Sequence, residues 1–337
     1  MLALTLNRVD SPEPVSRWPA PSTRRSRVSH PQPVTVGVIG LGAMGLGTAL
    51  AMREAGLSVI GCDVSAAARE TFVTAGGRCV DSPRELGEHC DVVVVVVVNA
   101  DQVEAVLFGE AGLTAAPGRT GLVIQCATVA PSYAESLGAR LDAAGLPLLD
   151  APISGGAAKS RQGRLSVMAS GSAGAFERAA PVLDAMAETV HRLGDSAGMG
   201  SRVKLVNQLL AGVHIAAAAE AMALGIRMGI DPEALYGVIT RSAGNSWMFE
   251  NRVPHILEGD YTPLSAVDIF VKDLNLVHQT GRELTFPTPL AASALQQFTA
   301  ASGAGYGRED DAAVIKVYQR LAGLALPGAA NDAEAPS

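Results

Sequence analysis

Lysine, aromatic residues and paired cysteines are all scarce in this chain. Only four of its 26 basic residues are lysines, and aromatic residues make up 4% of its 337 positions. The four cysteines form no Cys-x-x-Cys pair, and the six histidines show no metal-ligand spacing. The sequence therefore predicts a reduced cytoplasmic protein without a metal site.

Long apolar runs are missing as well. The most apolar run, Val92–Val98, has seven residues, whereas a membrane-spanning helix needs roughly 20. The N-terminus has no apolar core followed by a cleavage site, so we expect neither a secretion signal nor a membrane partner. The formal net charge is −7, which argues against nucleic acid as a general partner and leaves small anions open.

The length predicts two domains, each with its own core. We expect a disordered extension at 1–33, rich in Pro, Ser and Arg, for which a basic targeting leader is the alternative. A dinucleotide-binding domain is expected at 34–195 and an all-helical substrate and oligomerisation domain at 196–325, followed by a disordered tail at 326–337. The fold class is α/β, a Rossmann doubly wound sheet joined by a long helix to the helical domain.

A dinucleotide fingerprint opens the first domain. The buried strand expected at Thr35–Gly40 runs directly into the glycine turn, and the helix Leu46–Ala55 and the strand Leu57–Asp63 follow. Such a turn lets a pyrophosphate approach the backbone, and the helix N-terminus favours its charge. The predicted cofactor contacts in this turn are Gly40, Leu41, Gly42, Ala43, Met44 and Gly45.

The acid at the end of the second strand indicates the choice of cofactor. Asp63 lies 18 residues beyond Gly45, where a carboxylate accepts the ribose hydroxyls of NAD and repels the phosphate of NADP. We therefore predict NAD. Arg69 is near enough to favour NADP instead.

Further strands are expected at Asp91–Val98, Leu122–Cys126 and Leu146–Asp150, and the far edge of the sheet at Leu165–Ala169 and Thr189–Leu193. Thr128 follows a strand end, where open α/β sheets bind ligands, although it also suits a helix cap. Ser154, Gly155 and Gly156 leave another strand and could grip a carboxylate or form a capped turn.

One helix of roughly 30 residues is predicted from Met199 to about Gly229. Lys204 and Asn207 share a face at its start, which would point a cation and an amide into the seam between the domains. His214 lies two turns beyond Asn207 and could reach a substrate or serve as a core histidine. Lys272 lies on a later helix. We expect its neighbour Asp273 to point elsewhere, toward a structural pair.

Four motifs occur in the order found in the β-hydroxyacid dehydrogenases, the family of 3-hydroxyisobutyrate dehydrogenase and tartronate semialdehyde reductase. They are the glycine turn with Met44, Asp150–Gly156, Gly198-x-Gly200-x-x-x-Lys204-x-x-Asn207, and Lys272–Leu274. The chain resembles this family over about residues 34 to 324. Within it, Val206–Met222 is most similar to the L-threonate dehydrogenases, which oxidise C2 of a four-carbon sugar acid with NAD.

The resemblance implies roles for single residues. Lys204 would be the catalytic acid and base, and Asn207 would orient the substrate. Ser154, Gly155 and Gly156 would hold its carboxylate, and Thr128 and Lys272 would contact the cofactor near its nicotinamide end. His214 and the patch Asn245-Ser246 would suit extra hydroxyls. The family also implies a homodimer or homotetramer.

Other functions stay open. The enzyme could be a 3-hydroxyisobutyrate dehydrogenase or a reductase of tartronate semialdehyde or glyoxylate. A catalytically silent dinucleotide-binding protein would be expected to lose the amine, yet Lys204 is present. An imine reductase is disfavoured, since a cationic lysine suits an alkoxide better than an iminium.

Overall fold

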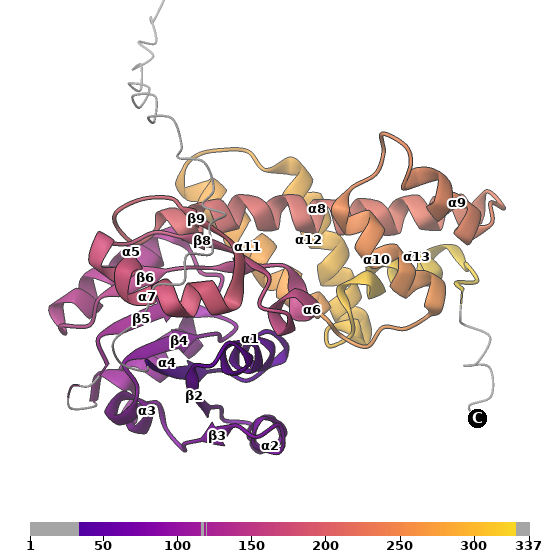
Figure 1. Cartoon of the computed structure of the whole chain (residues 1–337). Helices are drawn as coiled ribbons and strands as arrows, with labels where there is room; N and C mark the ends of the chain where they lie inside the picture. Colours follow the sequence, from indigo (N-terminus) through magenta and orange to yellow (C-terminus); the bar gives the residue numbers. More distant parts are fainter. Residues whose placement is uncertain (1–33, 116–117, 119, 328–337) are drawn as a thin grey trace, which may run out of the picture.

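The computed structural model describes residues 34–115, 118 and 120–327, so the expected extension and most of the expected tail lie outside it. Figure 1 shows an α/β part and a helical part joined by one long helix, α8 (Met199–Arg227). This arrangement confirms the predicted fold class.

A six-stranded parallel sheet forms the centre of the α/β part. Its strand order is β3-β2-β1-β4-β5-β6, the order of a doubly wound dinucleotide-binding sheet. Separate apolar clusters cover its two faces, so β4 is buried along its whole length. The strands are β1 (Thr35–Ile39), β2 (Ser58–Cys62), β3 (Arg78–Cys79), β4 (Val92–Val95), β5 (Leu122–Gln125) and β6 (Leu148–Asp150).

Helices flank this sheet. The first begins at Ala43, three residues before the predicted start at Leu46, because the backbone is already helical directly after Gly42. The helices of this part are α1 (Ala43–Glu54), α2 (Ala66–Thr74), α3 (Pro83–His89), α4 (Ala100–Phe108), the 3-10 turn Leu113–Ala115, α5 (Pro131–Ala143), α6 (Gly156–Arg161) and α7 (Ala173–Met186).

The expected far edge of the sheet is wrong. β8 (Leu165–Ala169) and β9 (Ala187–Arg192) form a separate three-stranded sheet with β7 (Ile153–Ser154), in which β7 runs antiparallel to β8. Only two residues separate β6 from β7, and β7 pairs with β8, so β8 is taken up by this second sheet and does not extend the first. An antiparallel bridge between Asp150 and Ser170 links the two sheets.

The helical part packs around α8. This helix is long and apolar enough to cross a membrane by length and composition, but Ile215, Ala219 and Met222 on it are buried in the core of the helical part. The other elements are α9 (Pro232–Ile239), α10 (Trp247–Glu258), α11 (Val267–Glu283), α12 (Pro289–Ala301), the π-helical turn Ser302–Tyr306, the 3-10 turn Asp311–Val314 and α13 (Ile315–Ala322).

Candidate active site

A cavity of about 650 Å³ lies between the α/β part and the helical part. Its walls come from the glycine turn, the ends of β4 and β5, the β7 segment, the first half of α8, and the starts of α10 and α11. The predicted site residues that line it are Gly42, Ala43, Met44, Gly45, Thr128, Ser154, Gly155, Gly156, Lys204, Asn207, His214 and Lys272. Residues nearly 230 positions apart in the sequence thus meet at one seam.

The glycine turn fits a dinucleotide pyrophosphate. Gly40 has a φ of +92°, and a Cβ there would lie 2.5 Å from Val96 O; a Cβ on Gly45 would lie 1.8 Å from Gly40 O. A Cβ on Gly42 would meet nothing within 4 Å, so space is open over the middle of the turn. The N-terminus of α1 carries no side-chain cap and no acid in its first turn, which leaves its N–H groups to an anion.

Asp63 lies beside this turn, outside the cavity around Lys204. Its Oδ2 accepts the Leu41 N–H at 2.6 Å and its Oδ1 accepts the Ser65 N–H at 2.7 Å. The side chain of Leu41 is buried in the core and its N–H is occupied by Asp63. The guanidinium of Arg69 donates to Asp63 O at 2.5 Å, so the acid and the nearby cation lie together at this end of the site.

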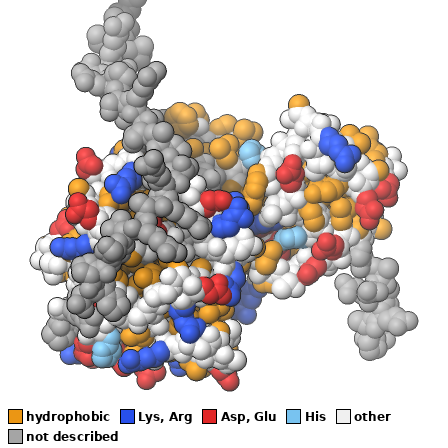
Figure 2. Space-filling view, viewed as in Figure 1, with side chains coloured by type: hydrophobic (Ala, Val, Ile, Leu, Met, Phe, Trp, Pro, Cys, Tyr) orange, Lys and Arg blue, Asp and Glu red, His pale blue; other side chains and the backbone are white. Residues whose placement is uncertain are grey.

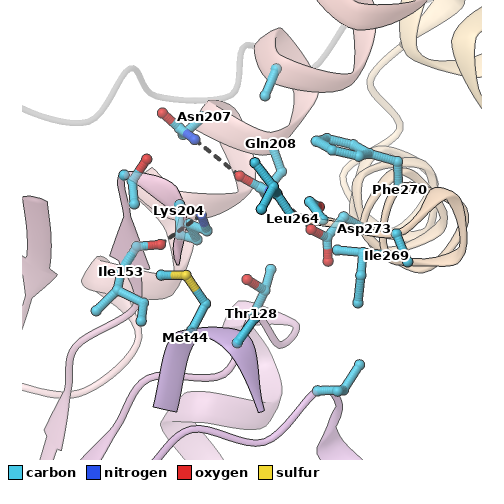
Figure 3. Close-up of a pocket in the computed structure, with 18 of the residues that line it drawn as sticks. Met44, Thr128, Ile153, Lys204, Asn207, Gln208, Leu264, Ile269, Phe270 and Asp273 are labelled. Carbon is cyan, nitrogen blue, oxygen red and sulfur yellow. Dashed lines mark hydrogen bonds between the residues drawn. The ribbon is translucent and has the colours of Figure 1, made fainter. Parts of the chain in front are cut away.

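Lys204 points into the cavity from the second turn of α8 (Figure 3). Its side chain is buried, and Nζ donates to Ile153 O at 2.8 Å. Burial lowers the pKa of this amine from 10.5 to about 8; the charge of Asp273 raises it and that of Lys272 lowers it. The amine is therefore mostly charged at pH 7 and mostly neutral above about pH 8, a change that an arginine could not make.

The first turn of α8 is fixed to the α/β part by a buried carboxylate. Asp150 Oδ2 accepts the N–H groups of Gly198 at 3.0 Å and Ser201 at 2.9 Å, and its Oδ1 accepts Ser201 Oγ at 2.8 Å. A carboxylate at a helix N-terminus is favoured by the helix dipole. Because Lys204 follows one turn later, this contact fixes the direction in which its amine points.

A chain of polar contacts crosses the cavity wall from α8 to α11. Asn207 Nδ2 donates to Gln208 Oε1 at 3.0 Å, and Gln208 Nε2 donates to Asp273 Oδ2 at 2.5 Å. Lys272 Nζ donates to Asp273 Oδ1 at 2.5 Å and to Thr128 O at 3.1 Å. Lys272 is therefore in contact with the backbone of Thr128.

The expectation that Asp273 points away from the site is wrong, whereas the expected pair is present, with Lys272. The side chain of Asp273 is 1% exposed and lines the cavity, because the first turns of α11 lie across the seam and both Lys272 and Asp273 face it. Gln208 also lines the cavity, although it was not among the predicted site residues. The available signal was a polar residue in an apolar helix directly after Asn207.

The Ser154–Gly156 segment forms the opposite wall. Gly155 has a φ of +135° and Gly156 a φ of +75°, conformations that glycine adopts without strain. A Cβ on Gly156 would meet nothing within 4 Å, so this backbone faces open space. The hydroxyl of Ser154 and the adjacent backbone line the same cavity as Lys204.

His214 and the start of α10 form the remaining wall, with Trp247 lining the cavity at 52% exposure. Asn245 and Ser246 do not line it, contrary to the expected role in binding hydroxyls. Ser246 caps α10 by accepting the Phe249 N–H, and Asn245 donates to Glu250 and to Thr240 O. Local contacts therefore take up the Ser246 hydroxyl and the Asn245 NH₂ group.

Comparisons with known proteins agree with this geometry. A family model described as the NAD binding domain of 6-phosphogluconate dehydrogenase matches residues 35–194, and one described as NAD-binding of NADP-dependent 3-hydroxyisobutyrate dehydrogenase matches residues 198–318. An L-threonate dehydrogenase of Cupriavidus necator is 60% identical over 296 residues, which cover 88% of this chain and 99% of the relative.

Two further relatives cover the same part of the chain. An L-threonate dehydrogenase of Escherichia coli K12 is 53% identical over 295 residues, which cover 87% of this chain and 97% of the relative. A solved structure described as 3-hydroxyisobutyrate dehydrogenase from Salmonella typhimurium is 51% identical, with a TM-score of 0.79 over 84% of this chain and 99% of that one. The chain therefore belongs to the 3-hydroxyisobutyrate dehydrogenase-like family of β-hydroxyacid dehydrogenases and is an NAD-dependent hydroxyacid dehydrogenase.

Proposed function

We propose that the enzyme oxidises the C2 hydroxyl of L-threonate to 2-oxo-tetronate with NAD⁺, and that Lys204 is its general base. The buried Lys204 amine, with a pKa lowered to about 8 in a cavity beside the glycine turn, carries the proposal. The identity of 50–60% to proteins named L-threonate dehydrogenase supports the substrate.

Each wall of the cavity would have one task. Ser154 Oγ and the N–H groups of Gly155 and Gly156 would hold the substrate carboxylate. Asn207 would orient the carbon chain so that the C2 hydroxyl meets Lys204 Nζ. Bound NAD⁺ supplies the hydride acceptor. The neutral amine of Lys204 would take the proton of the C2 hydroxyl as the C2–H bond breaks, and in the reverse reaction the ammonium would return it to the alkoxide.

The wall beyond Asn207 suits a chain longer than three carbons. His214 and Trp247 line the cavity there, and the imidazole nitrogens and the indole N–H can bond the C3 and C4 hydroxyls. A 3-hydroxyisobutyrate dehydrogenase, or a reductase of tartronate semialdehyde or glyoxylate, would use the same machinery. The name of the Salmonella structure favours the first of these as the second candidate.

A substrate panel tests the proposal. Purified enzyme is supplied with NAD⁺ or NADP⁺ and with L-threonate, D-threonate, D-erythronate, 3-hydroxyisobutyrate, D-glycerate or tartrate, and NAD(P)H is followed by absorbance. We expect the highest kcat/KM for L-threonate with NAD⁺, and a loss of about 10³-fold or more in Lys204→Met with unchanged NADH affinity. Preference for a shorter acid would overturn the substrate; full turnover in Lys204→Met would overturn the mechanism.

We also propose that the enzyme is a cytoplasmic homodimer or homotetramer. On the face shown in Figure 2, apolar side chains gather over the helical part. On α8 the exposed fractions are 62% for Val206 and 60% for Leu224, large values for apolar residues on a core helix, and Met228 directly after it is 65% exposed. Light scattering during gel filtration should give a mass two or four times that of the chain, and a monomer would contradict this.

A further inference from the structure

The amide of Asn207 can in principle face two ways. Rotation by half a turn exchanges its carbonyl oxygen and its NH₂ group, which have nearly the same shape and opposite hydrogen-bonding chemistry. A substrate hydroxyl at that amide would meet an acceptor in one orientation and a donor in the other. The direction of this side chain therefore decides which substrate groups fit beside Lys204.

The adjacent contacts allow only one direction. Asp273 is 1% exposed and ion-paired with Lys272, and an ionised carboxylate accepts hydrogen bonds without donating any. At the 2.5 Å contact with Asp273 Oδ2, Gln208 must therefore present its NH₂ group. The carbonyl oxygen of Gln208 then lies at the other side of its amide, 3.0 Å from Asn207.

Because the carbonyl oxygen of Gln208 faces Asn207, Asn207 must donate a hydrogen bond to it. Asn207 Nδ2 makes this bond, as the dashed line in Figure 3 shows, and Asn207 Oδ1 lies on the side away from Gln208. The reverse orientation would set two carbonyl oxygens against each other in a partly buried place, which is unfavourable because both would lose a hydrogen bond. Within the part of the chain that the structure describes, the second N–H and the oxygen of the Asn207 amide have no hydrogen-bond partner, so both can bind a ligand.

We propose that Gln208 is a positioning residue that sets the orientation of the Asn207 amide by relaying the polarity of the Asp273 carboxylate. The inference rests on the proposed function, in which Asn207 orients the hydroxy acid. Gln208 is itself buried, at 7% exposure, and its two amide atoms are both committed to Asp273 and Asn207. Lys204 is held separately, by Ile153 O, so Gln208 acts on Asn207 without holding the base.

Exchanging the amide of Gln208 and the carboxylate of Asp273 tests this relay. In Gln208→Glu two carboxylates face each other across the former 2.5 Å contact. In Asp273→Asn the introduced amide gives its oxygen to Lys272 and its NH₂ to Gln208, which turns Gln208 and then Asn207 around. In the double variant the introduced amide donates to the introduced carboxylate, which again accepts from Asn207, so the wild-type orientation returns.

We expect kcat/KM for L-threonate to fall about 10–100-fold in each single variant and to recover to within about threefold of wild type in the double variant. The affinity of the enzyme–NADH complex for L-threonate should also fall in each single variant and recover in the double variant. NADH fluorescence measures this affinity without turnover. A double variant as defective as the product of the two single losses would overturn the relay.

Two controls separate the relay from general damage. Gln208→Met keeps the length of the side chain and removes its amide donor and acceptor. It should lower kcat/KM about tenfold while the pH at which Lys204 titrates stays in place, and full activity in this variant would overturn the proposal. Asn275→Ala, on α11 but outside the cavity, should behave as wild type. If the wild type does not oxidise L-threonate, the proposed function is contradicted. The ranking of the wild type, the single variants and the double variant by their affinity for L-threonate would still test the relay.

Discussion

At the scale of single residues, the scarcity of lysine has a partial chemical explanation. Arginine supplies the exposed ion pairs, such as Arg140 with Glu104 and Arg161 with Glu54. Two of the four lysines, Lys204 and Lys272, line the cavity. A third, Lys316, packs over the rings of Tyr261 and Tyr306, where no proton transfer is needed. Lysine is thus retained at the site, where its titratable amine matters, and at one packing position as well.

Burial of Lys204 should cost stability. The pKa falls from 10.5 to about 8 on folding, so charging the amine in the folded state costs about 3 kcal/mol at pH 7. Lys204→Met removes this cost and loses one hydrogen bond worth about 1 kcal/mol, so the free energy of unfolding should rise by about 2 kcal/mol. Urea unfolding at pH 7 measures the difference.

The way in which this stability difference changes with pH tests whether the buried charge of Lys204 causes it. Between pH 8 and 10.5 the unfolded chain still holds the proton that the folded chain has released, so the wild type gains stability as pH rises and the advantage of Lys204→Met shrinks. A variant that is less stable than wild type at pH 7, or whose difference does not change up to about pH 10, would refute the buried cation.

At the scale of elements, the start of α8 leaves no room for a side chain. A Cβ at Gly200 would lie 2.3 Å from Met168 O and 2.8 Å from Asp150 O, both backbone atoms. Gly200→Ala should therefore displace the first turn of α8 and destabilise the protein by about 1–3 kcal/mol, with a loss of turnover because Lys204 moves. Thermal unfolding and kcat follow both effects.

Gly237 in α9 is the matched control for this prediction. A Cβ there would meet nothing within 4 Å, so Gly237→Ala should be neutral or stabilising by up to about 1 kcal/mol, with unchanged kcat. Equal behaviour of the two alanine variants would show that close packing at Gly200 does not position the helix.

Elements specified by local sequence could be predicted, and those specified by distant contacts could not. The glycine turn, the buried strands and the long helix each follow from a run of neighbouring residues. The second sheet depends on pairings such as that of Ser166 with Thr189, 23 residues apart, which no local pattern encodes. Asp273 was misplaced for the same reason, since which helix face is buried depends on the element packed against it.

At the scale of the whole molecule, the site exists because two separately packed parts share α8. Apolar clusters cover the two faces of the sheet, and another fills the helical part. The cavity between them takes the glycine turn from one side and Lys272 from the other. The order of motifs in the sequence predicted which residues meet there, whereas the contacts that connect Asn207 to Asp273 required the structure.

The pH dependence of kcat/KM for L-threonate oxidation tests the central claim, that neutral Lys204 is the base. We predict that kcat/KM rises tenfold per pH unit at low pH and levels off above about pH 8. In Asp273→Asn the rise should shift to lower pH, because this carboxylate raises the pKa of the amine. A profile that is flat from about pH 6 to about pH 10, or a rise that does not move in Asp273→Asn, would contradict the account.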